Sequence, residues 1–306
     1  MGNMTVSFMP HIRDNTSTNR IMLDVLIALC PAFIASILIF GGRSALVVGV
    51  CVASCVFFEW AYQKITKRKS TIKDLSACIT GVLLAFNLPE TIPLWMAVFG
   101  CGVAIILVKQ LFGGIGKNFA NPAITARIVM VISFPVAMTT WTQLPDAVSG
   151  ATPLALIQSG DLSYLPSLMD MFLGLRGGCL GETSALALLL GGAYLIIRRV
   201  ITWHIPVTFI GTVFVLTGLL GQQPSYQLMA GGLLIGAIFM ATDYVTSPQT
   251  AKGRIIFGIG AGLLTVLIRV WGSYPDGVSF AILFMNVLVP FINKFTQTKP
   301  LGGKGV

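Results

Sequence analysis

The sequence predicts an all-α integral membrane protein with about ten transmembrane helices, arranged as two inverted five-helix repeats with broken third helices. Three observations lead to this prediction: the composition, a series of apolar segments, and two interrupted segments at matching places. Of the 306 residues, 55% are hydrophobic and 10% are charged, and the mean hydropathy is +0.85. A soluble domain is about 45–50% apolar and about 25% charged, so this chain lacks the polar residues for a water-facing surface. The composition therefore excludes most soluble enzyme classes.

Apolar segments recur along the whole chain and leave no length for a separate soluble domain of ordinary size. A helix needs about 20 apolar residues to cross the hydrocarbon core of a bilayer. The approximate ranges of the ten segments are 21–41, 45–62, 75–88, 93–108, 122–138, 183–197, 205–220, 228–241, 255–270 and 278–292.

The distribution of cations predicts the orientation. With the N-terminus in the cytoplasm, sixteen of the 20 Lys and Arg residues fall in cytoplasmic segments, and only Arg43, Arg127, Arg176 and Arg269 remain. The opposite orientation violates the positive-inside rule, so both termini are expected in the cytoplasm. The net charge of +9 follows from this topology, and no nucleic-acid partner is expected.

Two of the apolar segments are short and end in polar, irregular sequence at membrane depth. They read TGVLLAFNLPE at residues 80–90 and GGLLIGAIFMATD at residues 231–243, each within the third segment of its half. Interrupted segments at corresponding places indicate an inverted repeat, and their free backbone groups must line a buried site because lipid cannot satisfy them. The alternative is a chance match between two glycine-rich helices.

The longest gap between segments spans residues 139–180 and contains Asp146, Asp161 and Asp170 but only one cation, Arg176. This loop is expected outside the cytoplasm, and a loop of this length is usually functional. The predicted organisation is a cytoplasmic segment (1–20), a first membrane repeat (21–138), the extracytoplasmic loop (139–180), a second membrane repeat (181–293), and a basic cytoplasmic tail (294–306) at the lipid surface.

The long loop contains the sequence SGATPLA at residues 149–155. It resembles the flavinylation motif of Rnf complexes and sodium-pumping NADH:quinone reductases, in which a threonine hydroxyl is esterified by the phosphate of FMN. The alternative is a Ser/Gly turn before a proline. Three further blocks favour the first interpretation: FGGIGKNFANPA at 112–123, LGETSA at 180–185 and MATDYVTSP at 240–248.

The four blocks occur in the order and at the spacing of one family, and together they resemble the D subunits of Rnf-type ion-translocating electron transport complexes. The related B subunits of sodium-pumping NADH:quinone reductases share the blocks. Those B subunits are generally longer, with a more extended N-terminal region, so a length of 306 residues favours the Rnf type.

The resemblance implies covalent FMN on Thr152, attached by a flavin transferase. A threonine hydroxyl can attack the diphosphate of FAD, and small neighbours let the transferase approach the backbone. Arg176 could neutralise the phosphate, and the helix N-terminus near Thr183 could bind the ring carbonyls. Alternatively, Glu182 only caps that helix. The expected FMN surroundings are Ser149, Gly150, Ala151, Arg176, Glu182 and Thr183.

The resemblance also implies a second, non-covalent flavin, riboflavin, in the membrane core. The glycine-rich block at 112–123 (the glycine block) fits neither the Walker A spacing nor the Rossmann fingerprint, so a nucleotide site is not expected there. The candidates come from the blocks at 112–123 and 240–248, which are expected on the cytoplasmic side. Thr152 is expected on the opposite side, so one flavin cannot contact both these blocks and Thr152. The alternative is that these helix ends simply pack through small residues. The riboflavin candidates are Gly114, Asn118, Asn121, Thr242 and Asp243.

Three carboxylates fall within or near the spans, where a charge is costly. Asp24 and Glu59 are expected to form structural ion pairs with Arg20 and Lys64. Asp243, in the interrupted eighth segment, is the candidate for an ion or ligand. The six cysteines lie almost entirely in apolar segments and form no CxxC pair, so no metal site is predicted, and no catalytic residue is assigned.

The resemblance implies a protein of a prokaryotic inner membrane that transfers electrons through flavins while the complex couples ferredoxin and NAD to Na+ or H+ transport. Its expected partners are a flavinylated G subunit, the small A and E subunits of the membrane part, the NAD-binding C subunit, the flavin transferase and membrane lipid. The alternative is a solute channel without redox function, because inverted five-helix repeats with broken third helices also resemble the urea-transporter architecture.

Overall fold

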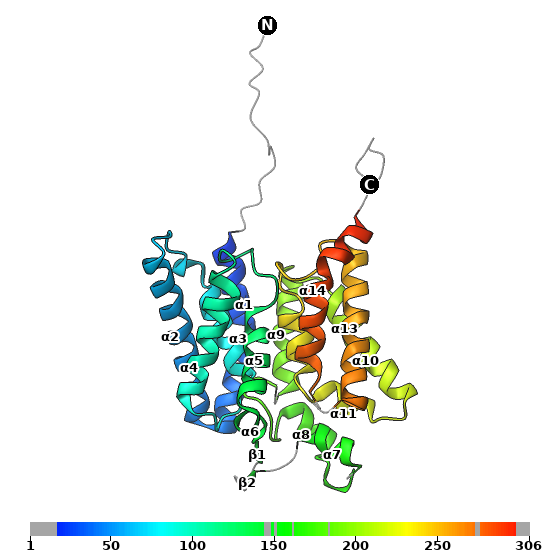
Figure 1. Ribbon diagram of the computed structural model, residues 1–306. Coiled ribbons are helices and arrows are strands. Elements are labelled where there is room, and N and C mark those ends of the chain that lie inside the picture. The colour runs from blue at the N-terminus through cyan, green and yellow to red at the C-terminus, as the bar shows by residue number, and fades with distance from the viewer. Residues whose placement is uncertain are drawn as a thin grey trace.

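The protein is seen in a computed structural model that describes residues 17–143, 148–149, 152–160, 162–182, 184–272 and 276–297. These residues are mostly helical, with one antiparallel pair of short strands, β1 (Thr142–Gln143) and β2 (Val148–Ser149). The helices form one bundle, and most of the long ones run roughly parallel or antiparallel (Figure 1). The start of α1 (Thr18–Phe40) and the end of α14 (Val278–Thr296) lie at one end of the bundle. The strand pair and the helices of residues 153–173 lie at the other end.

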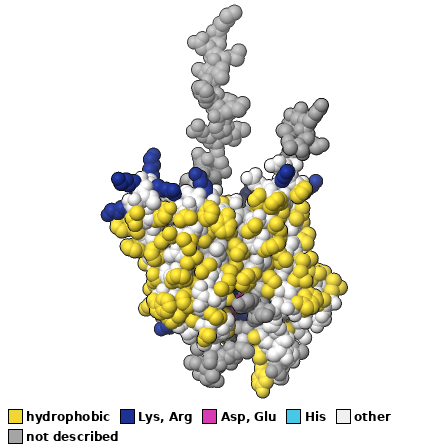
Figure 2. Space-filling view, in the orientation of Figure 1, with side chains coloured by type: hydrophobic (Ala, Val, Ile, Leu, Met, Phe, Trp, Pro, Cys, Tyr) yellow, Lys and Arg dark blue, Asp and Glu magenta, His cyan; other side chains and the backbone are white. Residues whose placement is uncertain are grey.

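Four described helices are long and apolar enough to cross a membrane: α1, α2 (Gly42–Ile65), α13 (Ala251–Trp271) and α14. Much of their surface carries exposed large apolar side chains, such as Leu38 and Phe291. Apolar side chains cover the middle of the visible face, and most visible Lys and Arg side chains lie at the end where α1 begins (Figure 2). A surface of this kind suits lipid, so the prediction of a multi-pass membrane protein is confirmed.

Five shorter apolar helices occupy other predicted segments: α3 (Ser76–Phe86), α4 (Leu94–Gly102) continued by the π-helix η2 (Val103–Gln110), α5 (Pro122–Ser133), α9 (Ala185–Ile197) and α10 (His204–Leu219). The remaining pieces are short. They are η1 (Ile72–Asp74), α6 (Pro135–Thr139), α7 (Pro153–Ser159), η3 (Leu162–Tyr164), α8 (Leu168–Leu173), α11 (Pro224–Met229), α12 (Leu233–Ile235) and the π-helix η4 (Gly236–Met240).

Both expected interruptions are present. Helix α3 ends at Phe86, and residues 87–93 continue without helix. In the eighth segment, the chain between α11 and α12 passes through Gly231 and Gly232, whose φ angles are 68° and 66°. Only glycine takes this left-handed backbone without strain, so the two glycines set the position of the break.

Several helix contacts in the first half have counterparts in the second half. Helix α2 packs against α4 and η2, and η2 packs against α5; likewise α10 packs against α13, and α13 against α14. Among the described residues, the most extensive helix–helix contacts between the halves are those of α1 with α9 and of α5 with α14. A Cβ on Gly191 would lie 2.1 Å from the carbonyl oxygen of Ala28, so α1 and α9 approach closely through this glycine.

The expected partners of two buried carboxylates are wrong. Asp24 binds Arg198 (3.2 Å) and the hydroxyl of Tyr194 (2.9 Å) on α9, not Arg20. Both partners come from the other half of the chain, because α1 packs against α9. Glu59 likewise binds Lys109 at 2.7 Å.

Lys64, the partner expected for Glu59, instead lies over the ring of Trp60, 4.8 Å from its centroid. Spacing along the sequence suggested only a neighbour on the same helix as the partner of Glu59. Helix packing instead supplies Lys109, which shields the charge of Glu59 from lipid.

Candidate functional site

A cavity of about 280 Å³ opens among the helices at the end of the bundle where α1 begins. It is bounded by α1, α3, η2, α9, the loop before α5 and the turn after η4. Four of the five residues predicted for riboflavin line it: Asn118, Asn121, Thr242 and Asp243. Tertiary structure thus brings together two sequence blocks that are more than a hundred residues apart.

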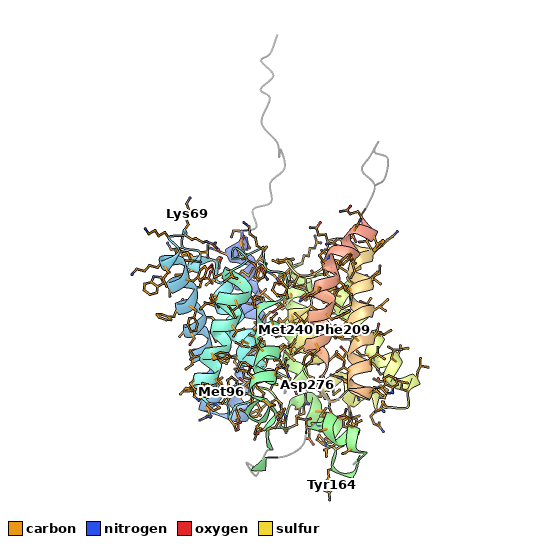
Figure 3. All side chains as sticks on the ribbon, viewed as in Figure 1. Lys69, Met96, Tyr164, Phe209, Met240 and Asp276 are labelled. Atoms are coloured by element: carbon orange, nitrogen blue, oxygen red, sulfur yellow. The ribbon has the colours of Figure 1, made fainter. Side chains whose placement is uncertain are left out.

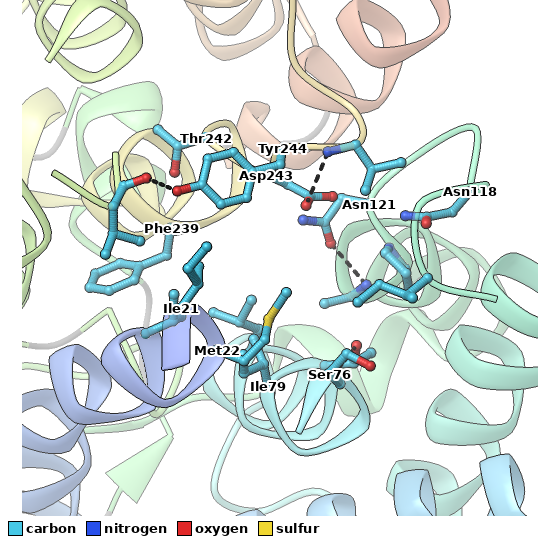
Figure 4. Close-up of a pocket in the computed structure, with 18 of the residues that line it drawn as sticks. Ile21, Met22, Ser76, Ile79, Asn118, Asn121, Phe239, Thr242, Asp243 and Tyr244 are labelled. Atoms are coloured by element: carbon cyan, nitrogen blue, oxygen red, sulfur yellow. Dashed lines mark hydrogen bonds between the residues drawn. The ribbon is translucent and has the colours of Figure 1, made fainter. Parts of the chain in front are cut away.

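The cavity has a polar side and an apolar side. Asn118, Asn121 and Ser76 lie on one side, and Phe239, Ile21 and Met22 extend toward the other (Figure 4). The turn that carries Thr242, Asp243 and Tyr244 crosses above them. Such a division suits a flat ligand that is apolar at one end and polar at the other.

Asn121 holds the wall in place instead of offering a free amide. Its side-chain oxygen accepts hydrogen bonds from the backbone N–H groups of Ala123 (3.0 Å) and Ile124 (3.4 Å) and so caps α5. Its amide nitrogen donates to the carbonyl of Met240 at 3.3 Å, which joins α5 to the end of η4. Asn118 donates only to the carbonyl of Ala120 (3.2 Å) and keeps more of its amide available for a ligand.

Asp243 is the free charge of the cavity. Its carboxylate accepts hydrogen bonds from the Thr246 hydroxyl (3.1 Å) and the Val245 backbone N–H (3.5 Å). Across the described parts of the chain, no cation forms an ion pair with it. Thr242, in contrast, donates its hydroxyl to the carbonyl of Ile238 within its own helical turn (2.6 Å).

Lys109 is a cavity residue that sequence reasoning missed. From its sequence position it was counted among the cations of the cytoplasmic segments, whereas it lies in η2 with only 3% of its surface exposed. Its ammonium donates to Glu59 (2.7 Å) and to the hydroxyl of Ser76 (2.6 Å). The available signal was its position directly after the apolar run 103–108.

The glycine block shapes the rim of the cavity. Gly113, Gly114 and Gly116 have φ angles of 116°, 93° and 85°. These angles favour glycine and turn the chain between η2 and Asn118. Gly114 itself does not line the cavity, whereas its neighbour Ile115 does.

Thr152 lies at the opposite end of the bundle, on the segment that leads into α7 (Figure 1). Its side chain is half-buried, and its hydroxyl oxygen accepts a hydrogen bond from the N–H of Ala155 (3.3 Å), which makes it the N-cap of α7. Gly150, Ala151 and Thr183 lie outside the described residues. Ser149 belongs to β2, and its side chain is likewise outside the description.

Arg176 and Glu182 are buried together instead of lying on the loop surface. Arg176 donates to the carbonyls of Glu182 (2.9 Å) and Met229 (2.5 Å), and its other terminal nitrogen is 4.0 Å from the Glu182 carboxylate. Burial lowers the pKa of Arg176, and the Glu182 carboxylate opposes that shift. Glu182 does not cap α9, because Ser184 accepts from the Ala187 N–H at that position.

Arg176 and Glu182 belong to a larger charged cluster at the interruption of the eighth segment. Arg127 on α5 donates to Asp276 (2.5 Å) and to the side-chain oxygen of Asn87 (2.6 Å). Asp276 lies between the level of Met240, in the middle of the bundle, and the end marked by Tyr164 (Figure 3). A Cβ on Gly232 would lie 3.4 Å from Glu182 and 3.5 Å from Arg127.

Arg269 completes this cluster from α13. It donates to the carbonyls of Gln227 (2.6 Å), Ala230 (2.9 Å) and Gly231 (3.4 Å), which the interruption of the helix leaves without partners. Arg127, Arg176 and Arg269 are three of the four cations that the count of loop charges left over. Their position outside the basic loops was the signal for this cluster, which sequence reasoning did not assemble.

Comparison with known proteins identifies relatives along nearly the whole chain. The model of the NQR2, RnfD, RnfE family matches residues 5–302. The chain is 49% identical over 304 residues to the D subunit of the Na(+)-translocating ferredoxin:NAD(+) oxidoreductase complex of Acetobacterium woodii, which covers 98% of this chain and 96% of that protein. It is 44% identical over 317 residues to the D subunit of the proton-translocating ferredoxin:NAD(+) oxidoreductase complex of Clostridium ljungdahlii, covering 97% and 96%.

A third relative is the D subunit of the ion-translocating oxidoreductase complex of Stutzerimonas stutzeri, 39% identical over 332 residues, which cover 94% of this chain and 93% of that protein. All three names describe the D subunit of a complex. This similarity confirms the resemblance that the four sequence blocks indicated.

Proposed function

The chain belongs to the NQR2, RnfD, RnfE family, and from this premise we propose that it is the flavin-carrying membrane component of an ion-translocating ferredoxin:NAD oxidoreductase complex. It works as one part of that enzyme, together with the G, A, E and C subunits, and contributes no catalytic residue of its own. Two relatives of similar identity are named for Na+ and for protons, and transport of either ion is compatible with this role.

The observation that carries the proposal is the cavity lined by Asn118, Asn121, Thr242 and Asp243. We assign it to riboflavin. A bound flavin supplies redox chemistry that protein side chains lack, and the protein's part is to bind, orient and shield it. The cavity's volume, about 280 Å³, lies near the lower end of the range for ligand sites, about 300–1,000 Å³.

The charges around the cavity favour riboflavin over FMN. Lys109 is its one lining cation among the described residues, and Glu59 already neutralises it at 2.7 Å. Asp243 adds a carboxylate without an ion-pair partner among those residues. A phosphate brought into this environment would meet net negative charge, whereas the uncharged ribityl chain of riboflavin would not.

Covalent FMN is proposed on Thr152, in the loop at the other end of the bundle. Two features support this assignment: the flavinylation motif and a half-buried hydroxyl at the start of a short helix. With the termini in the cytoplasm, the riboflavin cavity faces the cytoplasm and Thr152 the opposite side. Electrons that pass between the two flavins therefore cross the membrane core.

The inverted repeat is proposed together with ten membrane crossings. The packing supports it, because corresponding helices make corresponding contacts. Helix α2 packs against α4 in the first half, and α10, at the same position in the second half, packs against α13. In the proposed repeat, α1 corresponds to α9 and α5 corresponds to α14, so both of these contacts between the halves join corresponding helices. A twofold relation between the halves accounts for all of these contacts at once.

The channel alternative finds less support. In a urea-transporter-like protein, the route between the repeats stays open to solute. Here Asn87, at the end of the first interrupted segment, accepts a hydrogen bond from Arg127 on α5, and Arg127 also donates to Asp276 in the chain before α14. Side chains that are hydrogen-bonded to one another at this point obstruct the passage of a solute.

The experiment is to purify the chain after co-production with a flavin transferase and to separate two flavin fractions. Acid precipitation releases non-covalent flavin, for identification by chromatography, and mass spectrometry detects the FMN adduct on the peptide that contains Thr152. The proposal expects riboflavin in the first fraction and one FMN phosphoester in the second. Absence of both flavins from a folded, membrane-inserted chain would contradict it and favour the channel.

A further inference from the structure

We propose that a groove on the outer surface of the bundle binds one anionic phospholipid, with an acyl chain along the groove and the headgroup phosphate at Arg68. The groove lies between α2 on one side and α4 with η2 on the other, at the edge of the bundle (Figure 1). It shares no lining residue with the cavity assigned to riboflavin. The proposal therefore goes beyond the proposed function and does not depend on it.

The groove is apolar and has the length of an acyl chain. Its volume is about 470 Å³, and its lining includes Phe58, Trp95, Phe99, Gly102, Ile106 and Leu107. Twelve residues separate Trp95 from Leu107, which corresponds to about 18 Å along a helix. One leaflet takes up about half of a hydrocarbon core that is about 30 Å thick. The groove thus matches the acyl region of a single leaflet.

Gly102 leaves room at the middle of the groove. A Cβ at this position would lie 3.6 Å from the ring of Phe58, so any larger side chain would enter the space between the two walls. The backbone of Gly102 is helical (φ −60°, ψ −45°) and does not itself require glycine, which lowers helix stability. Its effect here is to keep the groove open.

Arg68 lies at the end of the groove where α2 and η2 both terminate. Its guanidinium donates to the carbonyl of Gln110 (3.2 Å), the last residue of η2, and lies over the ring of Tyr62, 5.8 Å from its centroid. Tyr62 follows Phe58 by four positions and shares its face of α2. A guanidinium has five N–H groups, so several of them remain for the oxygens of a phosphate.

Arg68 belongs to a basic cluster at this end of α2. The cluster consists of Lys64, Lys67, Arg68, Lys69 and Lys73. Residues 60–73 contain no carboxylate, and within the described part of the chain none of the five cations forms an ion pair. Lys69 lies beyond the end of α2 at the edge of the molecule (Figure 3). About four to eight cations directly after a membrane span attract anionic headgroups.

Two aromatic rings mark the depth of the headgroups. Trp60 and Tyr62 lie in the last turns of α2, and Lys64 lies 4.8 Å from the centroid of the Trp60 ring. Trp and Tyr are enriched where the hydrocarbon core meets the headgroups. The basic cluster therefore lies at the level of the phosphates, and the apolar groove extends from it into the core.

The charge at this end favours a lipid over a membrane-spanning helix of a partner subunit. Such a helix carries its own excess of Lys and Arg at the cytoplasmic side. It would bring like charges to the basic cluster, whereas an anionic headgroup brings the opposite charge to the same place. An anionic phospholipid is complementary to both parts of the site.

The first test measures the role of the headgroup. Native mass spectrometry of the purified full-length chain measures Kd for phosphatidylglycerol and for phosphatidylcholine of equal chain length. The proposal expects phosphatidylglycerol to bind about fivefold or more tightly, because it carries a net negative charge. Arg68→Gln should weaken its binding about tenfold, since hydrogen bonds to a charged donor are lost.

The matched control is Arg199→Gln, which removes the same charge from the same end of the bundle. Arg199 is exposed and follows α9, whose last residues lie beside the start of α1 and outside the groove. This variant should leave both Kd values unchanged. Equal wild-type affinity for the two lipids, or equal effects of Arg68→Gln and Arg199→Gln, would overturn the proposal.

The second test measures the role of the groove. Gly102→Leu should weaken the binding of both lipids about tenfold, because the added side chain occupies the space of the acyl chain. Gly49→Leu, at an exposed glycine of α2 whose Cβ would meet no atom within 4 Å, is the control and should change neither Kd. Both variants keep Arg68, so the groove is tested even if Arg68→Gln does not fold. Unchanged affinity in Gly102→Leu would place the lipid elsewhere and contradict the assignment.

A cross-linking experiment identifies the occupant in the assembled complex. Phe99 is replaced by the photoreactive analogue benzoylphenylalanine, and membranes are irradiated before purification. The proposal expects a cross-link to a phospholipid, seen as its added mass on the peptide that contains position 99. A cross-link to a partner subunit at that position would show that a protein helix fills the groove and would overturn the proposal.

Discussion

At the end of the bundle where α1 begins, a single buried lysine is held by Glu59 beside a cavity with an unpaired carboxylate. At the interruption of the eighth segment, three arginines bind two carboxylates and the carbonyls of the broken helix. The first region is net negative and encloses a cavity, whereas the second is net positive and its arginines donate to the carbonyls and carboxylates around the interruption. The comparison teaches that the two ends of the interrupted segments are used differently. The start of α3 and the end of η4 line a cavity, whereas the interruptions after Phe86 and at Gly231 and Gly232 are bound by arginine side chains.

The two regions are joined by one helix. On α5, Asn121 caps the N-terminus at the cavity, and Arg127 reaches Asp276 in the charged cluster. Six residues separate them, which corresponds to about 9 Å along a helix. A change at either region can therefore reach the other through a rigid element.

The largest expected effect concerns Thr152, which lies beyond the charged cluster. Thr152→Asn should abolish the covalent FMN completely, because the amide cannot form the phosphoester, while the N-cap of α7 is kept. Thr152→Ser keeps both the hydroxyl and the cap and serves as the matched control. Mass spectrometry of the peptide reads the adduct, and an adduct on the Asn variant would place the flavin on another residue.

The second largest effect is on stability, and it differs between Lys109 and Arg127, the buried cations of the two regions. Lys109→Met should lower the free energy of unfolding by about 3–5 kcal/mol, because Glu59 is left charged and fully buried. Arg127→Met should cost less, about 2–3 kcal/mol, because the side chain of Asp276 is 31% exposed and water screens it.

Thermal unfolding of the two variants in detergent measures this difference. Arg43→Met, at an exposed arginine that donates to the carbonyl of Glu90, is the control and should change stability little. An Arg127→Met variant that is less stable than Lys109→Met would reverse the comparison.

A smaller effect on stability distinguishes Gly231 from Gly232, the two glycines at the interruption of the eighth segment. Gly231→Ala should destabilise by about 2 kcal/mol or more, because its Cβ would meet Leu154 at 2.3 Å in addition to the left-handed strain. Gly232→Ala meets no atom closer than 3.4 Å and should cost only the strain, about 1–2 kcal/mol. Comparison of the two unfolding midpoints checks the order, and equal midpoints would mean that α7 moves aside.

The smallest expected effect is a change in ligand preference at the cavity. Asp243→Asn should improve FMN binding relative to riboflavin about tenfold, because the substitution removes a charge that repels phosphate. The ratio of the two Kd values, measured by fluorescence titration, reports it. Asp170→Asn, at the other end of the molecule, should leave the ratio unchanged; a ratio unaffected by Asp243→Asn would mean that charge does not select the ligand.

Much of the helical framework was predictable from local sequence. The ten apolar segments coincide with helices within a few residues at most ends, and both interruptions are present. The pairing of Asn118 and Asn121 with Thr242 and Asp243 in one place was also anticipated, from the resemblance of their sequence blocks to one family.

The partners of the buried charges were not predictable. Lys109 and Glu59 are 50 positions apart, and Arg127 and Asp276 are 149 apart. Spacing along the chain reveals neighbours on one helix, such as Lys64 for Glu59, but it carries no signal for a partner on a helix that packs from elsewhere. The burial of Arg176 and Glu182 was missed for the same reason.

The sequence by itself determined that the chain spans a membrane. It also determined the residues at which most helices begin and end, and which two segments are interrupted. It could do so because lipid requires apolar side chains and because proline and glycine act locally on the backbone. Only the tertiary structure decided which carboxylate meets which cation, which polar groups face a cavity, and which are consumed in closing a break. Those outcomes depend on distances between segments far apart in the chain, and a buried charge is stable only where such a contact supplies its partner.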